Sequence, residues 1–268
     1  VERSTFLEYV AANTDVQALS ASLADSTIQL GKNQARGLGA GGVPAVGKAS
    51  AIDAAEEIKS FVDGVDMIFV TSGMGGGTGS GAAPVVAQLA KESGCLTVGI
   101  VTKPFSFEGK RRMEQAVAAI DELQSHVDIL IVVSNDKLLE IVPEGVPLQD
   151  AFAIADEILR QGITGISDIV VKPGLINVDF ADVRAVMANA GPALMGIGRG
   201  FGKTRARDAA LAAVSSPLLD FPIEKAKGVV FTITGNGDMS LQEVQDVASV
   251  IEGIVGDDAN IIFGTSVD

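Results

Sequence analysis

The sequence predicts an α/β protein: a parallel sheet covered by helices on both faces, a long central helix, and a smaller α+β domain with a mixed sheet. Near-continuous apolar strands alternate with helical patterns through the first half of the chain, which is typical of parallel strands buried on both faces. A long helical pattern follows, and the spacing of strands and helices then changes. We expect the three parts to span 1–147, 148–173 and 174–268.

The elements of the first part follow from the periodicity of its apolar residues. A helix over 49–64 places Ile52 and Ile58 on one face. A second helix is expected to begin near Ala82, with Pro84 in its first turn. A third helix spans 110–127, and strands are predicted within 6–15, 65–73, 95–105 and 128–136, where the first, third and fourth segments end in loop residues.

The second half begins with a helical pattern over 148–170 that is too long and too apolar for an ordinary surface helix. It therefore predicts a central connecting helix. The smaller domain is predicted to contain strands at 193–200, 228–235 and 259–267, separated by helices at 204–216 and 241–255.

Composition excludes several classes of protein. The net charge of −14 disfavours binding to nucleic acid, whose phosphates repel an acidic surface. The longest plain apolar runs, such as 129–133, have the length of a strand, so direct membrane insertion is not expected. Cys95 is the single cysteine, so an internal disulfide is ruled out. We expect Cys95 to be a small core residue.

Ligands of an open parallel sheet bind beyond the carboxyl ends of its strands. The loops that follow the predicted strands should therefore meet at one rim. They are rich in glycine, amide, carboxylate and basic residues, and they comprise 13–15, 37–44, 74–81, 103–112 and 134–136.

The glycine-rich loop at 75–81 lies between a predicted strand and a predicted helix. Backbone amides at such a helix N-terminus bind phosphate, and the lack of side chains allows close approach. A tight turn is the alternative. A P-loop would need lysine where Ala82 stands, and a dinucleotide site would need an acidic residue where the next strand ends in Thr102 and Lys103. Neither familiar motif fits.

Two further groups of polar residues have two interpretations each. Asn13 and Asp15 follow the first strand, where Asp15 suits Mg²⁺ and both residues suit an Asx-type turn. The cluster of Asn177, Asp179 and Asp182 stands at the start of a helix. It either caps that helix or polarises a water molecule. The small-residue loop 39–42 would add amides around the same phosphates.

Taken together, these segments resemble the tubulin/FtsZ family. The run "GMGGGTGSGAAPV" looks like the family's signature loop, and "NTDVQAL", "GLGAGGVP", "SNDKLL" and "DAFAIAD" follow the family order over nearly the full chain. "FSFEGKRR" and "NVDFADVR" are similar to FtsZ rather than to tubulin. The resemblance implies a Rossmann-like GTPase domain, a central helix and a smaller C-terminal domain that begins with the catalytic loop.

The resemblance also assigns residues by position. Phosphate contacts are expected from the amides of the glycine loop, the Thr78 side chain and the 39–42 loop. Ribose contacts, base recognition by Asn135 and Asp156, and packing of Phe152 on guanine are implied in the same way. The expected nucleotide-binding residues are Asn13, Asp15, Ala40, Gly41, Gly75, Gly76, Gly77, Thr78, Gly79, Pro104, Glu108, Arg112, Asn135, Phe152 and Asp156. GTP or GDP is the implied nucleotide, with Mg²⁺ near Asp15 and K⁺ as a further candidate ion.

The family pattern gives the acidic cluster another role. Asn177, Asp179 and Asp182 would complete the nucleotide site of the next molecule and position the attacking water in trans. The implied partner is the chain itself in a head-to-tail homopolymer, or a paralogue in a co-polymer. Division proteins that tether the filament to the membrane through a C-terminal tail are also implied. The expected location is the cytoplasm at the division site of a bacterium, or the plastid stroma.

Relative to the family pattern, the chain starts after a first strand and a further phosphate loop, and it stops before a last strand and the tail. If those segments are absent, weaker nucleotide binding is expected. Two other hypotheses remain open: a filament or regulatory subunit that binds nucleotide weakly and does not hydrolyse it, and a nucleotide-dependent oxidoreductase. The missing ribose carboxylate disfavours the oxidoreductase.

Overall fold

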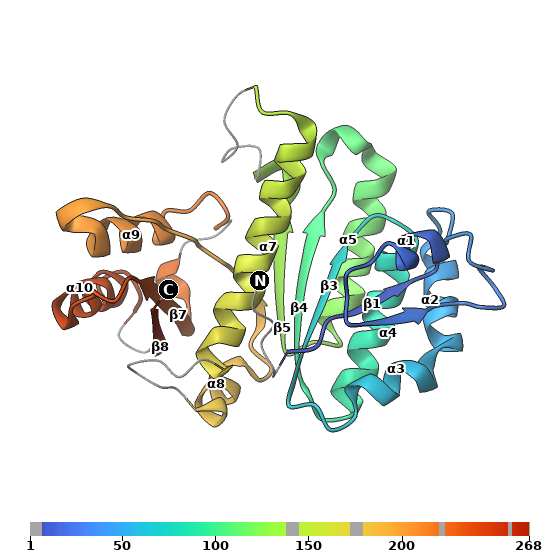
Figure 1. Ribbon diagram of the computed structural model, residues 1–268, viewed down its shortest axis with the longest axis horizontal. Helices are drawn as coiled ribbons and strands as arrows, with labels where there is room; N and C mark the ends of the chain where they lie inside the picture. Colours follow the sequence, from blue (N-terminus) through green and yellow to red (C-terminus); the bar gives the residue numbers. More distant parts are fainter. Residues whose placement is uncertain (1–6, 138–144, 172–178, 220–222, 257–258, 268) are drawn as a thin grey trace. The chain divides into compact units, whose positions relative to one another are not determined.

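The computed structural model shows two compact units, 1–136 and 137–268, and each is described by itself (Figure 1). The described parts of the chain are 7–137, 145–171, 179–219, 223–256 and 259–267.

The strands of the first unit are parallel. β1 (Val10–Asn13) pairs with β2 (Ser26–Gln29), and β4 (Leu96–Lys103) lies between β3 (Met67–Gly73) and β5 (Ile129–Ser134). All residues of β4 from 96 to 101 are buried. This burial on both faces explains the near-continuous apolar run in the sequence and confirms the predicted parallel-sheet class.

Helices cover this sheet, and α4 contributes to two hydrophobic clusters. One cluster contains Ile58 and Val62 of α3 with Leu89 of α4, and the other contains Val101 of β4 with Leu123 of α5. Cys95 is buried in the first cluster, as expected. The helical segments of the unit are α1 (Val16–Ser20), α2 (Pro44–Asp53), α3 (Ala55–Val62), α4 (Thr78–Glu92), the 3₁₀ turn η1 (Ser106–Glu108) and α5 (Lys110–Gln124).

The predicted helix over 49–64 is wrong as one element. The helix is interrupted at Ala54, whose φ and ψ of −98° and 13° are not helical. Helical periodicity therefore does not continue from α2 into α3, and the two helices bury different faces. Ile58 is buried, but Ile52 is 56% exposed. The apparent common face crossed a helix boundary, which periodicity alone does not detect.

The predicted start of the next helix is also wrong. α4 begins at Thr78, and Pro84 lies inside it rather than in its first turn. An internal proline removes one helical hydrogen bond and costs about 3 kcal/mol. Nine buried residues of α4, including Ala87 and Ala90, provide the packing that offsets this cost. Gly79 and Gly81 therefore belong to the helix, and the loop itself is Gly75–Gly77.

The second unit contains the predicted long helix α7 (Leu148–Val171). β7 pairs with β8 in parallel, with Phe231 stacked on Phe263 at 5.2 Å between ring centroids. This described ladder is parallel, so the mixed sheet stays a prediction. The other elements are α8 (Phe180–Met187), β6 (Gly191–Ala193), η2 (Gly202–Thr204), α9 (Arg205–Val214), η3 (Ile223–Lys225), β7 (Gly228–Gly235), α10 (Leu241–Glu252) and β8 (Asn260–Val267).

The strand predicted at 193–200 is wrong beyond Ala193, where β6 ends. This segment packs tightly against α9 instead. A Cβ on Gly196 would overlap the carbonyl oxygen of Ala213, and one on Gly198 would overlap that of Ala209. The glycines at every second position allow this close contact between the two backbones. The alternation therefore reflects packing against α9 and not a β-strand.

Among the residues that the structure describes, no helix is both long and apolar enough to cross a membrane.

Candidate functional site

The turn after β3 begins with Gly75, which needs to be glycine. Its φ is +97°, in the region that side chains rarely adopt. A Cβ would also lie 2.8 Å from the carbonyl oxygen of Arg112 and 3.2 Å from Cγ of the buried Pro104. The amide of Gly75 donates a hydrogen bond to Oγ of Ser80 at 2.8 Å. Ser80 belongs to α4 and is 2% exposed, so this buried hydrogen bond ties the turn to the first turn of α4.

The other glycines of this run have different functions. A Cβ on Gly77 would lie 2.7 Å from the backbone nitrogen of Val43, and one on Gly81 would overlap the carbonyl oxygen of Pro44. These two glycines allow α4 to approach α2 closely. No atom lies within 4 Å of a Cβ placed on Gly76. Gly76 therefore faces open space, and its lack of a side chain is not required by packing.

The small-residue loop before α2 lies beside this turn. Gly39 and Gly41 have φ of +85° and +59°, and a Cβ on either would meet no atom within 4 Å. The residues that precede the two helices, Val43 for α2 and Gly77 for α4, are in contact. Both helices direct the positive ends of their dipoles to this place. Free amides come mainly from the start of α4, because α2 begins with Pro44, which has no N–H, and the amides of Val43 and Val46 bond to the carbonyls of Ala40 and Val43.

The segment after β1 adopts the Asx-type geometry that was one of its two interpretations. Oδ1 of Asn13 accepts the amide of Asp15 at 3.2 Å, and Oδ1 of Asp15 accepts the amide of Gln17 at 2.8 Å. Asp15 is thereby the N-cap of α1. Its other carboxylate oxygen accepts no hydrogen bond from the described residues, so this geometry leaves that oxygen able to bind a cation such as Mg²⁺.

No group of three or more metal-binding side chains occurs in the described part of the chain. Mg²⁺ is commonly held by one or two carboxylates together with substrate phosphates and water. The free oxygen of Asp15 fits that arrangement, but Asp15 alone does not form a metal site.

The loops after β4 and β5 are joined to each other. Oδ1 of Asp136 accepts hydrogen bonds from the amide of Ser106 at 3.0 Å and from its hydroxyl at 3.2 Å. The candidate ribose-side residues Glu108 and Arg112 form an ion pair at 2.5 Å. Oδ1 of Asn135 is buried without a hydrogen-bond partner among the described residues. A buried amide oxygen in this state is unusual, and a ligand N–H group would satisfy it.

The candidate guanine-side residues Phe152 and Asp156 belong to the second unit. They lie four residues apart on α7, hence on one helix face, and both are exposed. Their position relative to Asn135 stays a prediction.

The acidic cluster lies at the start of α8. Asp179 is the N-cap, and its Oδ1 accepts the amide of Asp182 at 2.8 Å, which is the capping geometry. Val183 and Met187 are buried and fix the opposite face of the helix. The Asp182 side chain is exposed, and its carboxylate has no hydrogen bond or ion pair within the described chain. Asn177 lies outside the described residues.

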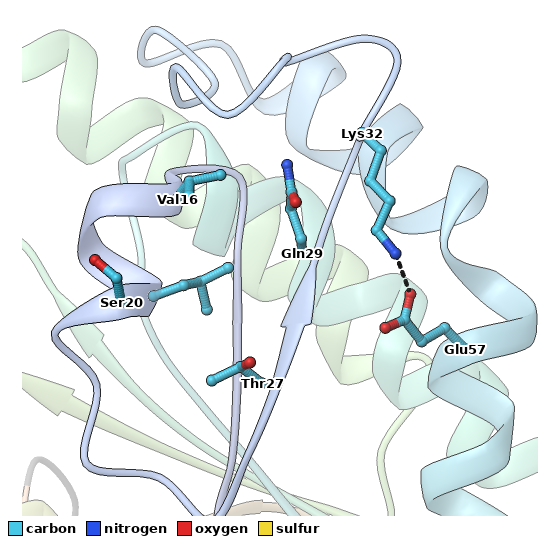
Figure 2. A pocket seen from close by; sticks show the side chains of 7 residues that line it. Val16, Ser20, Thr27, Gln29, Lys32 and Glu57 are labelled. Carbon is cyan, nitrogen blue, oxygen red and sulfur yellow. Dashed lines mark hydrogen bonds and ion pairs between the residues drawn. The ribbon is translucent and has the colours of Figure 1, made fainter.

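A hollow of about 360 Å³ lies elsewhere in the first unit, and an ion pair of 3.1 Å between Lys32 and Glu57 forms part of its wall (Figure 2). None of the candidate site residues lines it. The lining consists of Val16, Leu19, Ser20, Thr27, Gln29, Lys32 and Glu57. This hollow is therefore separate from the candidate site.

Three side chains that organise this rim were not singled out from the sequence: Thr14, Ser80 and Asp136. Each is a hydroxyl or carboxylate within or beside a loop that was identified. Their position was a usable signal, because polar residues flanked by glycine or amide residues often bond to backbone. Their partners, up to 64 residues away, could not be read from the sequence.

Comparison with known proteins identifies the fold. The GTPase domain of the Tubulin/FtsZ family matches residues 2–143, and the C-terminal domain of the FtsZ family matches 191–268. An empty FtsZ dimer from M. jannaschii is 46% identical, with a TM-score of 0.94 over 97% of this chain and 76% of that one. The chain belongs to the tubulin/FtsZ family.

Other solved structures agree with this family. A point variant of M. jannaschii FtsZ is 47% identical, with a TM-score of 0.93 over 97% of this chain and 78% of that one. A GTPgS-bound protofilament of CetZ2 from Haloferax volcanii is 25% identical, with a TM-score of 0.78 over 97% and 79%. The chain therefore has the fold of a cytoskeletal GTP-binding protein in a family of GTPases, and GTP or GDP, with Mg²⁺, is the ligand of that family.

Proposed function

We propose that this FtsZ-family chain binds GTP at the rim of its first unit, polymerises head-to-tail, and hydrolyses GTP only where the acidic cluster of the next molecule completes the site. The observation that carries the proposal is the pair of helix N-termini in contact at Val43 and Gly77, beside the open backbone of Gly76. Two converging helix dipoles, together with the first amides of α4, suit a chain of phosphates better than a single turn would.

Guanine recognition is proposed for Asn135 and Asp156. The unsatisfied Oδ1 of Asn135 can accept a hydrogen bond from a base, and a carboxylate can accept the N–H donors that guanine presents and adenine lacks. Phe152 supplies an aromatic surface for the base. Glu108 and Arg112, which bond to each other here, would turn toward the ribose side, and Pro104 backs Gly75.

Hydrolysis is proposed to use Asp179, Asp182 and Asn177 in trans. The Asp182 carboxylate is exposed and unpartnered in its own described chain, whereas α8 itself is anchored by buried Val183. Such a carboxylate can orient a water molecule whose oxygen bonds to the γ-phosphorus as the bond to the bridging oxygen breaks. GDP and phosphate result. The contact is heterologous and does not close, so it extends into a filament.

A Mg²⁺ ion near Asp15 would neutralise phosphate charge during this reaction. Asn13 orients Asp15 through the hydrogen bond to its amide. Partners other than the chain itself, location at a division site, and a plastid or bacterial setting stay part of the proposal. They rest on the resemblance alone.

The test is phosphate release measured against protein concentration, together with light scattering. Turnover per molecule should rise steeply with concentration because the active site forms between molecules. Asp182→Ala should retain bound nucleotide and lose turnover. Asp121→Ala is the matched control, since Asp121 is an exposed aspartate near the far end of α5. Turnover that is independent of concentration would contradict hydrolysis in trans.

A further inference from the structure

We propose that Thr14 is a positioning residue that ties the two phosphate-binding loops together and orients the hydroxyl of Thr78 toward a phosphate. This inference rests on the proposed GTP site and adds to it a residue with no expected contact to the nucleotide.

Thr14 lies between the two loops. It follows β1 directly and is fully buried, with 0% of its surface exposed. Its carbonyl oxygen accepts the amide of Gly39 at 3.1 Å, which holds the small-residue loop. Its Oγ1 lies 2.6 Å from Oγ1 of Thr78, the first residue of α4. One residue thus bonds to both loops through two different atoms.

The surrounding backbone fixes Thr14 in place. The amide of Leu30 bonds to the carbonyl of Asn13 at 2.9 Å, and the amide of Val16 bonds to the carbonyl of Gly37 at 3.2 Å. Asp15 forms an isolated bridge with Leu38. Because the chain is held on both sides of Thr14, its hydroxyl has a defined direction.

The bond between the two hydroxyls has a preferred polarity when an anion is present. A hydroxyl donates one hydrogen and accepts others. If Thr14 donates to Thr78, the hydrogen of Thr78 remains available for a phosphate oxygen. If Thr78 donates to Thr14, that hydrogen is used. A phosphate beside Thr78 favours the first arrangement, and hydrogen bonds in such a chain strengthen one another.

The test compares the affinities of full-chain variants for GTP and for guanosine, which lacks phosphates, by isothermal titration calorimetry. Thr14→Val should weaken GTP binding about 3- to 10-fold, as expected for one lost neutral hydrogen bond, and leave guanosine binding unchanged. Thr14→Ser should restore GTP affinity. Thr97→Val is the matched control, because Thr97 is also fully buried and its hydroxyl bonds to the Cys95 carbonyl at the start of β4.

A second variant keeps the test decisive if Thr14→Val folds poorly. Thr78→Val should lose at least about 10-fold in GTP affinity, because its hydroxyl is expected to bond to a charged group. In that background Thr14→Val should add nothing, since the two residues act as one unit.

Wild-type GTP affinity in Thr14→Val, an equal loss for guanosine, additive losses in the double variant, or wild-type affinity in Thr78→Val would each overturn the inference. A wild-type chain that binds guanosine but not GTP would instead overturn the proposed phosphate site, and the inference with it.

Discussion

The two kinds of glycine in and around the glycine loop predict opposite results for two similar substitutions. Gly76→Ala places a methyl group in open space, with no atom within 4 Å of its Cβ and with φ outside the left-handed region. The free energy of unfolding should therefore stay the same or rise by up to about 1 kcal/mol, because alanine restricts the unfolded chain. Gly47→Ala places the same methyl group between α2 and α4.

The structure gives the cost of the second change. A Cβ on Gly47 would overlap the carbonyl oxygen of Gly77 and lie 3.0 Å from Cα of Thr78. The two helices must separate to admit it, which costs about 1–3 kcal/mol. Alanine's better helix propensity returns at most about 1 kcal/mol. Gly47→Ala should therefore lower stability.

Nucleotide binding should be weakened by Gly76→Ala even though the fold is not. The methyl group of Gly76→Ala would stand where phosphate approaches the loop amides. Loss of one hydrogen bond to a charged group, about 1.5–3 kcal/mol, corresponds to roughly 10- to 100-fold weaker GTP binding. Urea unfolding followed by circular dichroism measures the first quantity, and calorimetric titration with GTP measures the second. Wild-type GTP affinity in Gly76→Ala, or destabilisation equal to that of Gly47→Ala, would refute this division of the glycines.

Three further predictions concern the packing and charges of each unit. The hydrogen bond from Arg205 lowers the pKa of Glu243 from 4.5 to about 2. The pair therefore stabilises the fold above about pH 4.5, and this stabilisation is lost as the pH falls toward 2. In urea unfolding, Glu243→Gln should make the free energy of unfolding depend less on pH between about 4.5 and 2. Gly198→Ala should lower the melting temperature, because its Cβ would overlap the Ala209 carbonyl. Leu123→Ala should cost about 2–5 kcal/mol in chemical unfolding, because Leu123 is fully buried.

Much of the fold could be predicted because strand burial appears in the sequence itself. β4 and β5 are largely apolar because both faces of the sheet are covered, and α7 is recognisable by its length. The predicted element boundaries were wrong where packing between helices, and not the local sequence, determines the backbone conformation. The break at Ala54, the internal Pro84 and the glycines facing α9 depend on neighbouring helices, which no window of sequence contains.

The candidate site divides in the same way. The loops after parallel strands were predictable because topology places the strand ends together, and the described contacts join several of them. The functions of single residues were not. Asp15 and Asp179 act as helix caps here, which capping propensity already allowed. The contacts of Thr14 with Gly39 and Thr78 cross between loops, and so they depend on the folded structure.

The most direct measurement of the central claim mixes two variants at a GTP concentration that fills the wild-type site but not the weakened site of Gly76→Ala. Asp182→Ala retains the nucleotide site and loses the acidic cluster, whereas Gly76→Ala weakens the nucleotide site and retains the cluster. In a head-to-tail polymer formed at random from equal amounts, about a quarter of the contacts pair an intact site with an intact cluster. Phosphate release should therefore recover to about a quarter of the wild-type rate. A mixture no more active than the sum of its two components would show that the acidic cluster does not act on the neighbouring molecule.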